Sequence, residues 1–198
     1  MPGRVYLTSD QTAIAEHMGA IVQGEITMPR LDLAPGEEMH VMTPDRVLQP
    51  MRWGMIMSGR TNARRRPVME TIVNARSETV FQKSAFKGVS RGLVPVNGWY
   101  GWTGKPRRKI RWRIRRADEG LLVFAAIFDV WTAPGGIEVP QVATITCEPN
   151  DLIRPIHHRM GAILEPDDWE PWLAGKTVPL KPAPDNVFTI EEVEEPVG

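Results

Sequence analysis

The clearest pattern of hydrophobic and polar positions spans residues 109–115, where apolar and basic side chains alternate strictly. Alternation with a period of two predicts a β-strand that has one apolar face and one basic face. The apolar run 121–128 predicts a buried strand, and the polar residues 118–120 predict a turn between the two strands, which together would form a hairpin. Residues 140–147 predict a further core strand.

Fewer segments indicate helices. Residues 10–18 begin with polar residues that can cap a helix, residues 77–86 are a second candidate, and a third helix opens at Pro166 with acidic residues in its first turn. A strand is expected from about Lys181, followed by a loose acidic tail from about residue 190. The 18 prolines and 17 glycines divide the chain into short pieces. The pattern therefore predicts one compact α+β domain over residues 1–198, rich in β-strands and with a few short helices.

Composition narrows the class of protein. The chain has 198 residues, of which 42% are hydrophobic and 24% are charged, as in ordinary globular domains. Its one cysteine, Cys147, excludes an intrachain disulfide and a cysteine-cluster metal site. The four histidines show no metal-ligand spacing, and no segment has the apolar core of a signal peptide or a membrane span. We expect a cytoplasmic, nucleoid-associated monomer without metal, cofactor or membrane contact.

The formal net charge is zero, but the charges are unevenly distributed along the chain. Residues 105–116 include eight basic residues and no acidic one, whereas residues 191–195 include four glutamates. Such asymmetry favours a polyanionic partner for one face, and the alternative is a solvated basic strand. Lys109, Arg111 and Arg113 of this strand are candidate nucleic-acid contacts.

Three short motifs carry candidate chemistry. Asn74 and Arg76 share one face of a strand end, where the amide can donate and accept hydrogen bonds and the guanidinium can hold a phosphate. His157 follows a proline-broken loop and can act as a general acid or base near neutral pH. Trp53 lies near basic residues, and aromatic faces stack on unpaired bases. An ordinary salt bridge, a structural histidine and a core tryptophan are the alternatives that stay open.

Taken together and in this order, these motifs resemble the SRAP family, the SOS response-associated peptidases or abasic-site processing proteins. The resemblance extends nearly from end to end. It is carried by the following blocks: Gly3-Arg4, Leu33-Ala34-Pro35, Arg52-Trp53-Gly54-Met55, Asn74-Ala75-Arg76-Ser77-Glu78-Thr79, Leu93-Val94-Pro95, Gly98-Trp99-Tyr100-Gly101-Trp102 and His157-His158-Arg159-Met160.

The resemblance implies a β-rich α+β fold and binding to single-stranded DNA that carries an abasic site, as part of the response to DNA damage. It also implies that an N-terminal cysteine, exposed by its own autopeptidase step, crosslinks to the ring-opened sugar as a thiazolidine. The positions that match the assisting groups are Asn74 for the amide and His157 for the acid–base imidazole. Arg4 and Arg76 match phosphate or site contacts. Pro35 and Trp53 match the surface that meets the splayed strand.

Two departures from the family pattern concern the reacting groups. The nucleophile position is occupied by Pro2 and the position of the family's glutamate by Gly101. A thiazolidine requires sulfur, so it cannot form at Pro2, and removal of Met1 through a cysteine thiol is excluded as well. Gly101 could also simply suit a backbone turn, with Glu78 supplying the carboxylate instead. Whether the protein is an enzyme is therefore left open.

Three hypotheses follow. The first is a DNA-binding protein that recognises single-stranded or abasic DNA without crosslinking to it. The second is an altered enzyme in which the secondary amine of Pro2, once Met1 is removed, forms an iminium with the sugar and promotes strand cleavage. The third is a protein-interaction module that has lost DNA binding, and its weakness is that the basic strand then needs another partner.

Overall fold

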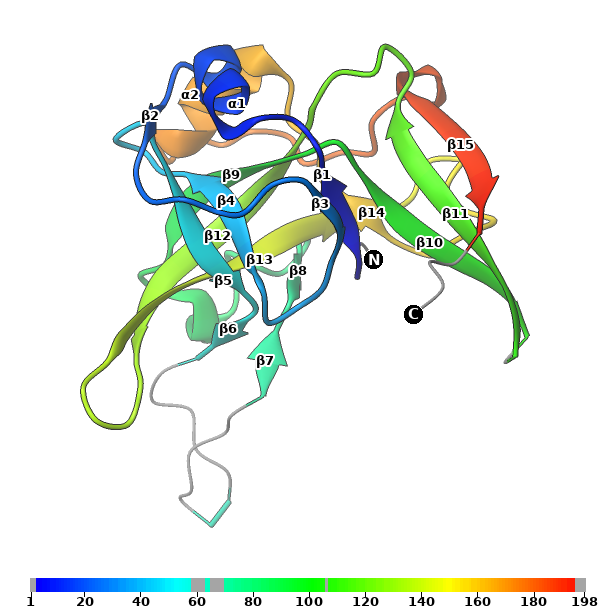
Figure 1. Ribbon diagram of the computed structural model, residues 1–198. Helices are drawn as coiled ribbons and strands as arrows, with labels where there is room; N and C mark the ends of the chain where they lie inside the picture. The colour runs from blue at the N-terminus through cyan, green and yellow to red at the C-terminus, as the bar shows by residue number, and fades with distance from the viewer. Residues whose placement is uncertain (1–2, 58–62, 65–69, 106, 195–198) are drawn as a thin grey trace.

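The computed structural model describes residues 3–57, 63–64, 70–105 and 107–194 (Figure 1). The strands are β1 (Val5–Leu7), β2 (Ile21–Val22), β3 (Arg30–Leu33), β4 (Glu38–Met42), β5 (Val47–Trp53), β6 (Met55–Ile56), β7 (Thr71–Ile72), β8 (Asn74–Arg76), β9 (Ser90–Val96), β10 (Gly98–Lys105), β11 (Arg108–Arg116), β12 (Leu122–Thr132), β13 (Glu138–Cys147), β14 (Met160–Gly161) and β15 (Phe188–Val193). The helices are α1 (Gln11–Met18), α2 (Pro166–Leu173) and the 3-10 turns η1 (Ser84–Phe86) and η2 (Asp185–Val187). None of the described helices is long and apolar enough to cross a membrane.

The larger sheet closes into a barrel. Its strand order is β14-β13-β12-β9-β4-β5-β2, and β13 additionally pairs in parallel with β5, so β13, β12, β9, β4 and β5 form a ring. The apolar runs of β12 and β13 are buried, which confirms the strands predicted over residues 121–128 and 140–147. Closure pairs the sheet edges and encloses the core.

A second, five-stranded antiparallel sheet in the order β15-β11-β10-β1-β3 flanks the barrel (Figure 1). A single residue, Asn97, separates β9 of the barrel from β10 of this sheet. The Oδ1 atom of Asn97 accepts hydrogen bonds from the backbone N–H groups of Thr8 (2.8 Å) and Ser9 (3.0 Å). The asparagine side chain thus fastens the segment after β1 to the point where the chain changes sheet.

The predicted hairpin over residues 109–128 is wrong, although its turn at residues 118–120 is present. Strand β11 pairs with β10 and β15, whereas β12 pairs with β9 and β13 in the barrel. The burial patterns give the physical reason. In β11 only Arg111 and Ile114 are buried, and they lie on opposite faces, whereas the first six residues of β12 are buried continuously and belong inside a closed sheet.

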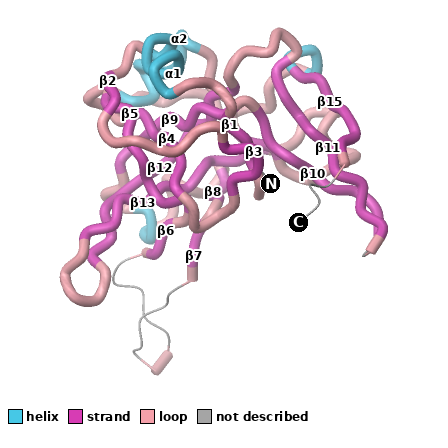
Figure 2. The backbone as a smooth tube through the Cα atoms, viewed as in Figure 1, coloured by secondary structure: helices cyan, strands magenta, loops and turns pink. Residues whose placement is uncertain are grey.

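The two α-helices lie next to each other at one end of the molecule (Figure 2). The rings of His17 in α1 and Trp169 in α2 meet edge to face at 5.8 Å. The side chain of Asp10 caps α1 through the N–H of Thr12 at 2.8 Å, so the expected helices at residues 10–18 and from Pro166 are confirmed.

The expected helix over residues 77–86 is wrong. This segment forms turns that end in η1, and the side chain of Val80 is fully buried. The run Thr79-Val80-Phe81 contains β-branched and aromatic residues, which lose side-chain freedom in a helix and lower its stability. The turns place Glu78 where its side chain can pair with Arg159 on the loop before β14.

The loose acidic tail expected from about residue 190 is partly a strand. Glu191 lies within β15, opposite Arg113 of β11. The Oε1 atom of Glu191 accepts from Nε of Arg113 at 2.9 Å and from Nε of Arg115 at 3.2 Å. Opposite charges on neighbouring strands therefore neutralise part of the basic strand within the chain. This weakens the objection that the strand must have an external partner.

Candidate functional site

The candidate site lies where the start of β1 meets β10. Val5 pairs with Trp99, and the N–H of Tyr100 donates to the carbonyl oxygen of Arg4 at 2.9 Å. This hydrogen bond extends the contact past the start of β1, so Arg4 lies beside Tyr100. The start of the chain therefore lies beside the part of β10 that contains Gly101, the position that the resemblance assigns to the family's glutamate. Pro2 lies outside the described residues.

Gly101 has no space for a side chain. A Cβ atom added there would lie 2.5 Å from Cγ2 of Ile156 and 3.5 Å from Cδ1 of Ile114, and real Cβ contacts essentially never fall below 3.0 Å. Gly101 lies inside β10 with ordinary strand geometry, so a special backbone turn does not explain the glycine. Ile156 occupies the volume that a carboxylate-bearing side chain would need.

Asn74 and Arg76 lie on β8, which pairs in parallel with β13. Ala75 between them is buried while Arg76 is exposed, so Asn74 and Arg76 share the opposite face of the strand. The Oγ1 atom of Thr144 donates to Oδ1 of Asn74 at 2.5 Å, which fixes the orientation of the amide. The strand thus presents one oriented amide and one accessible guanidinium.

His157 follows Ile156 directly on the loop before β14. Its Nδ1 atom accepts a hydrogen bond from the backbone N–H of Arg159 at 3.0 Å, and its ring stacks on that of His158 with centroids 4.3 Å apart. Burial disfavours the charged imidazolium and lowers the pKa of His157 to about 4. At neutral pH the ring is therefore uncharged, and with Nδ1 accepting, Nε2 carries the proton and is a hydrogen-bond donor.

Arg159 and Glu78 form a bidentate ion pair that joins this loop to the turn after β8. The two guanidinium nitrogens lie 2.6 and 2.8 Å from the two carboxylate oxygens, and Nη2 also donates to the carbonyl of Thr146 at 2.6 Å. These bonds to Arg159 lower the pKa of Glu78. Glu78 is thus committed to Arg159, which argues against its serving as a replacement carboxylate. No local sequence signal identifies this pair, because its members are 81 residues apart.

A basic groove of about 360 Å³ runs beside this pair. Its lining includes Arg76, Arg154 and Arg159, together with His158 and a single acid, Glu148. A narrow surface with several guanidinium groups attracts anions and can hold phosphate oxygens. The described residues contain no cluster of three or more side chains suited to a metal ion.

Two of the expected DNA contacts are buried. Trp53 is fully buried at the closure between β5 and β13, and its Nε1 donates to the carbonyl of Val73 at 3.1 Å. Full burial is incompatible with stacking on a DNA base, so its expected role at the surface is wrong. The Arg111 side chain is only 4% exposed, lies 3.6 Å above the ring of Tyr100 and is 3.3 Å from Asp32, so it is not an accessible contact either.

The other expected contacts are accessible to different degrees. Pro35 is exposed in the loop after β3. Arg4 is half-exposed and lies 3.4 Å from Asp32. Arg113 is partly exposed but paired with Glu191. Lys109 is exposed at the start of β11, in the hairpin tip, by which we mean Lys105, Arg107, Arg108 and Lys109.

Fold and site together define a barrel-centred β protein with an amide and a guanidinium on β8 and a neutral imidazole on the loop before β14, which the Glu78–Arg159 ion pair joins to the turn after β8. The family model described as SOS response associated peptidase (SRAP) matches residues 1–198, and the chain belongs to this family. The chain is 30% identical over 186 residues to the abasic site processing protein YoqW of Bacillus subtilis (strain 168), covering 89% of this chain and 81% of that protein. It is 32% identical over 163 residues to the abasic site processing protein HMCES of Gallus gallus, covering 70% of this chain and 48% of that protein.

Solved structures confirm the fold. A crystal structure of a protein from Bacteroides thetaiotaomicron superposes with a TM-score of 0.85 at 23% identity, covering 97% of this chain and 92% of the other. A crystal structure of a protein from Bordetella bronchiseptica gives 0.77 at 21% identity, covering 98% and 100%. The coarse α+β expectation is thereby sharpened to a β-rich domain with a closed barrel at its centre.

Proposed function

We propose that this protein binds single-stranded DNA that carries an abasic site and does so without forming a thiazolidine crosslink. Membership of the SRAP family and the similarity to abasic site processing proteins support DNA that has lost a base as the ligand. The proposal that no crosslink forms rests on the position of Ile156, because its Cγ2 atom fills the space that a side chain at position 101 would need.

The chemistry of the remaining side chains supports the same conclusion. A thiazolidine needs a thiol next to the reacting amine, and residue 2 is a proline. The only cysteine, Cys147, is buried at the end of β13, and burial raises the pKa of its thiol to about 11. It can therefore not replace the missing sulfur as a thiolate at neutral pH.

The retained groups are suited to holding a DNA backbone. Arg76 and the basic groove can bind phosphates, and Nε2 of His157 can donate a hydrogen bond to an oxygen of the opened sugar. Farther away, all residues of the hairpin tip are exposed and form no ion pair with the described residues. We assign the tip to sequence-independent backbone contacts.

The proposal is tested by fluorescence anisotropy with three labelled DNAs: single-stranded with one abasic site, single-stranded and intact, and duplex. We expect the abasic single strand to bind most tightly, and affinity to fall as salt rises. Arg76→Ala should weaken binding, whereas Arg46→Ala, a remote arginine paired with Glu170, should not. Equal binding to duplex without salt dependence would contradict the proposal.

Covalent chemistry is tested separately with the same abasic strand. A denaturing gel is run after incubation with and without borohydride, and intact mass establishes whether Met1 is present. We expect no stable adduct, no trapped adduct and no strand cleavage. A borohydride-trapped adduct together with cleavage, from protein that lacks Met1, would overturn the non-covalent proposal in favour of iminium chemistry at Pro2.

A further inference from the structure

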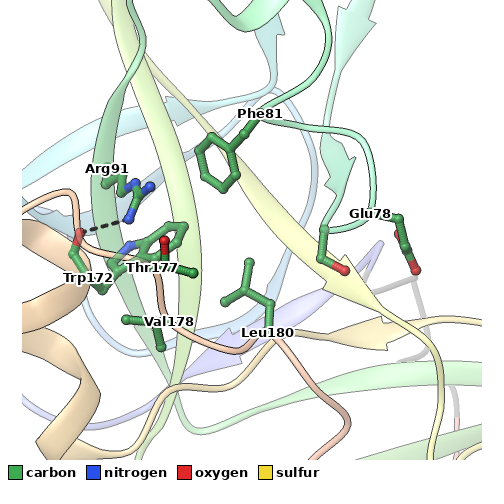
Figure 3. Close-up of a pocket in the computed structure, with 8 residues that line it drawn as sticks. Glu78, Phe81, Arg91, Trp172, Thr177, Val178 and Leu180 are labelled. Atoms are coloured by element: carbon green, nitrogen blue, oxygen red, sulfur yellow. Dashed lines mark hydrogen bonds between the residues drawn. The ribbon is translucent and has the colours of Figure 1, made fainter.

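We propose that the pocket on the far side of the Glu78–Arg159 pair binds an unpaired nucleobase of the same DNA strand. The pocket has a volume of about 370 Å³ and is formed by the turn after β8, the start of β9 and the segment that follows α2 (Figure 3). This inference rests on the proposed function and adds a subsite to it. Four side chains carry the argument: Ser77, Phe81, Arg91 and Leu180.

Arg91 provides a fixed planar cation at one end of the pocket. Its guanidinium carbon lies 4.6 Å from the ring centre of Phe81 and 4.4 Å from that of Trp172. Its Nη1 donates to the backbone carbonyls of Trp172 (3.5 Å) and Lys176 (2.5 Å), and no carboxylate in the described part of the chain forms an ion pair with it. Such a guanidinium, held by rings and carbonyls, suits the carbonyl and ring-nitrogen acceptors of a base.

Phe81 provides an aromatic surface beside this cation. Its side chain is 51% exposed although it is large and apolar, and it faces the space between Arg91 and Leu180 (Figure 3). Leu180 adds an apolar wall, and Ser77 adds a hydroxyl. A ring for stacking, a planar donor and a small hydroxyl together match a nucleobase better than a phosphate, which would need several converging cations.

The pocket lies next to the proposed path of the DNA. Arg76 and Arg159 line the basic groove, while the following residues Ser77 and Glu78 line the pocket. The two cavities therefore flank the Glu78–Arg159 ion pair. A strand whose backbone lies in the groove can turn the base of a neighbouring nucleotide over this pair and into the pocket.

The test is an anisotropy scan with a set of single-stranded oligonucleotides. Each carries the same abasic site and, in addition, one stable abasic spacer moved through the positions on either side. For the wild-type protein, we expect one flanking position at which the spacer weakens binding by roughly 5- to 150-fold, because stacking of one base is worth about 1–3 kcal/mol. Phe81→Ala should weaken binding of the parent strand by a similar factor and abolish the sensitivity at that position.

Val130→Ala is the matched control, because Val130 is also 51% exposed but lies on β12 and does not line this pocket. Phe81→Leu keeps the apolar character without the ring and should behave like Phe81→Ala. Thermal unfolding checks that each variant is folded. If the wild-type protein binds abasic strands but Phe81→Ala leaves the spacer profile unchanged, the base subsite is refuted while the proposed function stands. If the wild-type protein binds no single strand, the proposed function itself fails.

Discussion

Substituting Gly101 by alanine tests whether Ile156 fills the place of the family's glutamate. The added methyl carbon would lie 2.5 Å from Cγ2 of Ile156. Overpacking of this kind costs roughly 1–3 kcal/mol. Replacing glycine by alanine where the backbone is unstrained stabilises the folded state by about 0.4–1 kcal/mol, because it lowers the conformational entropy of the unfolded chain. Gly101→Ala should therefore lower the free energy of unfolding by about 1–2 kcal/mol.

A second substitution identifies the atom responsible. Ile156→Ala removes Cγ2 and should make Gly101→Ala nearly neutral, which is a favourable coupling of about 1–2 kcal/mol in a double-mutant cycle. Ile156→Val retains both γ carbons, so it should leave the cost of Gly101→Ala unchanged and is the matched control.

Urea unfolding of the wild-type protein, the single variants and the two double variants measures this coupling. The reasoning is refuted if Gly101→Ala costs nothing, if its cost adds to that of Ile156→Ala without coupling, or if Ile156→Val relieves it as well as Ile156→Ala does. In each of those cases Ile156 would not be what excludes a side chain at Gly101.

Three further outcomes are expected. Burial lowers the pKa of His40 from 6.5 to about 4, so between these pH values the unfolded state binds a proton that the folded state does not. The free energy of unfolding should therefore fall by up to about 3 kcal/mol as the pH drops from 6.5 to 4. Denaturant unfolding at several pH values should show a smaller loss for His40→Leu than for the wild-type protein. Glu78→Gln should lower the free energy of unfolding by about 1–3 kcal/mol at pH 7, because buried Arg159 loses a charged partner. Since the pKa of Glu78 is lowered, this difference from the wild-type protein should shrink as the pH falls below the ordinary range of glutamate, and a constant difference would contradict the pairing. Each alanine substitution in the hairpin tip should reduce the slope of log affinity against log salt for single-stranded DNA by about 0.7, whereas Arg115→Ala, which removes a guanidinium already paired with Glu191, should change it less.

Local patterns sufficed for several elements. The apolar runs at residues 121–128 and 140–147 identify barrel strands because strands buried on both faces need continuous apolar sequence. The first helix is identified by Asp10, whose side chain satisfies N–H groups within the same turn. The ordered motifs identify the family, since the blocks that contain Asn74 and His157 match the family's blocks in order.

Contacts between distant segments could not be read in this way. A strand pattern does not show which strand lies next to it, so the sequence predicts one hairpin for β11 and β12 although they belong to different sheets. Likewise, the motif around Trp53 does not show whether its side chain faces solvent or the interior. Its burial follows from the pairing of β5 with β13, which closes the barrel.

The amino-acid sequence by itself determines that proline and glycine stand at positions 2 and 101, where the resemblance to the family implies a thiol and a carboxylate, because those are matters of residue identity. The folded chain shows that Ile156, 55 positions later, packs into the space that a side chain at position 101 would enter. It likewise commits Glu78 to Arg159. Both facts depend on which atoms meet when strands and loops far apart in the chain pack together, and this packing has no signature in the local sequence.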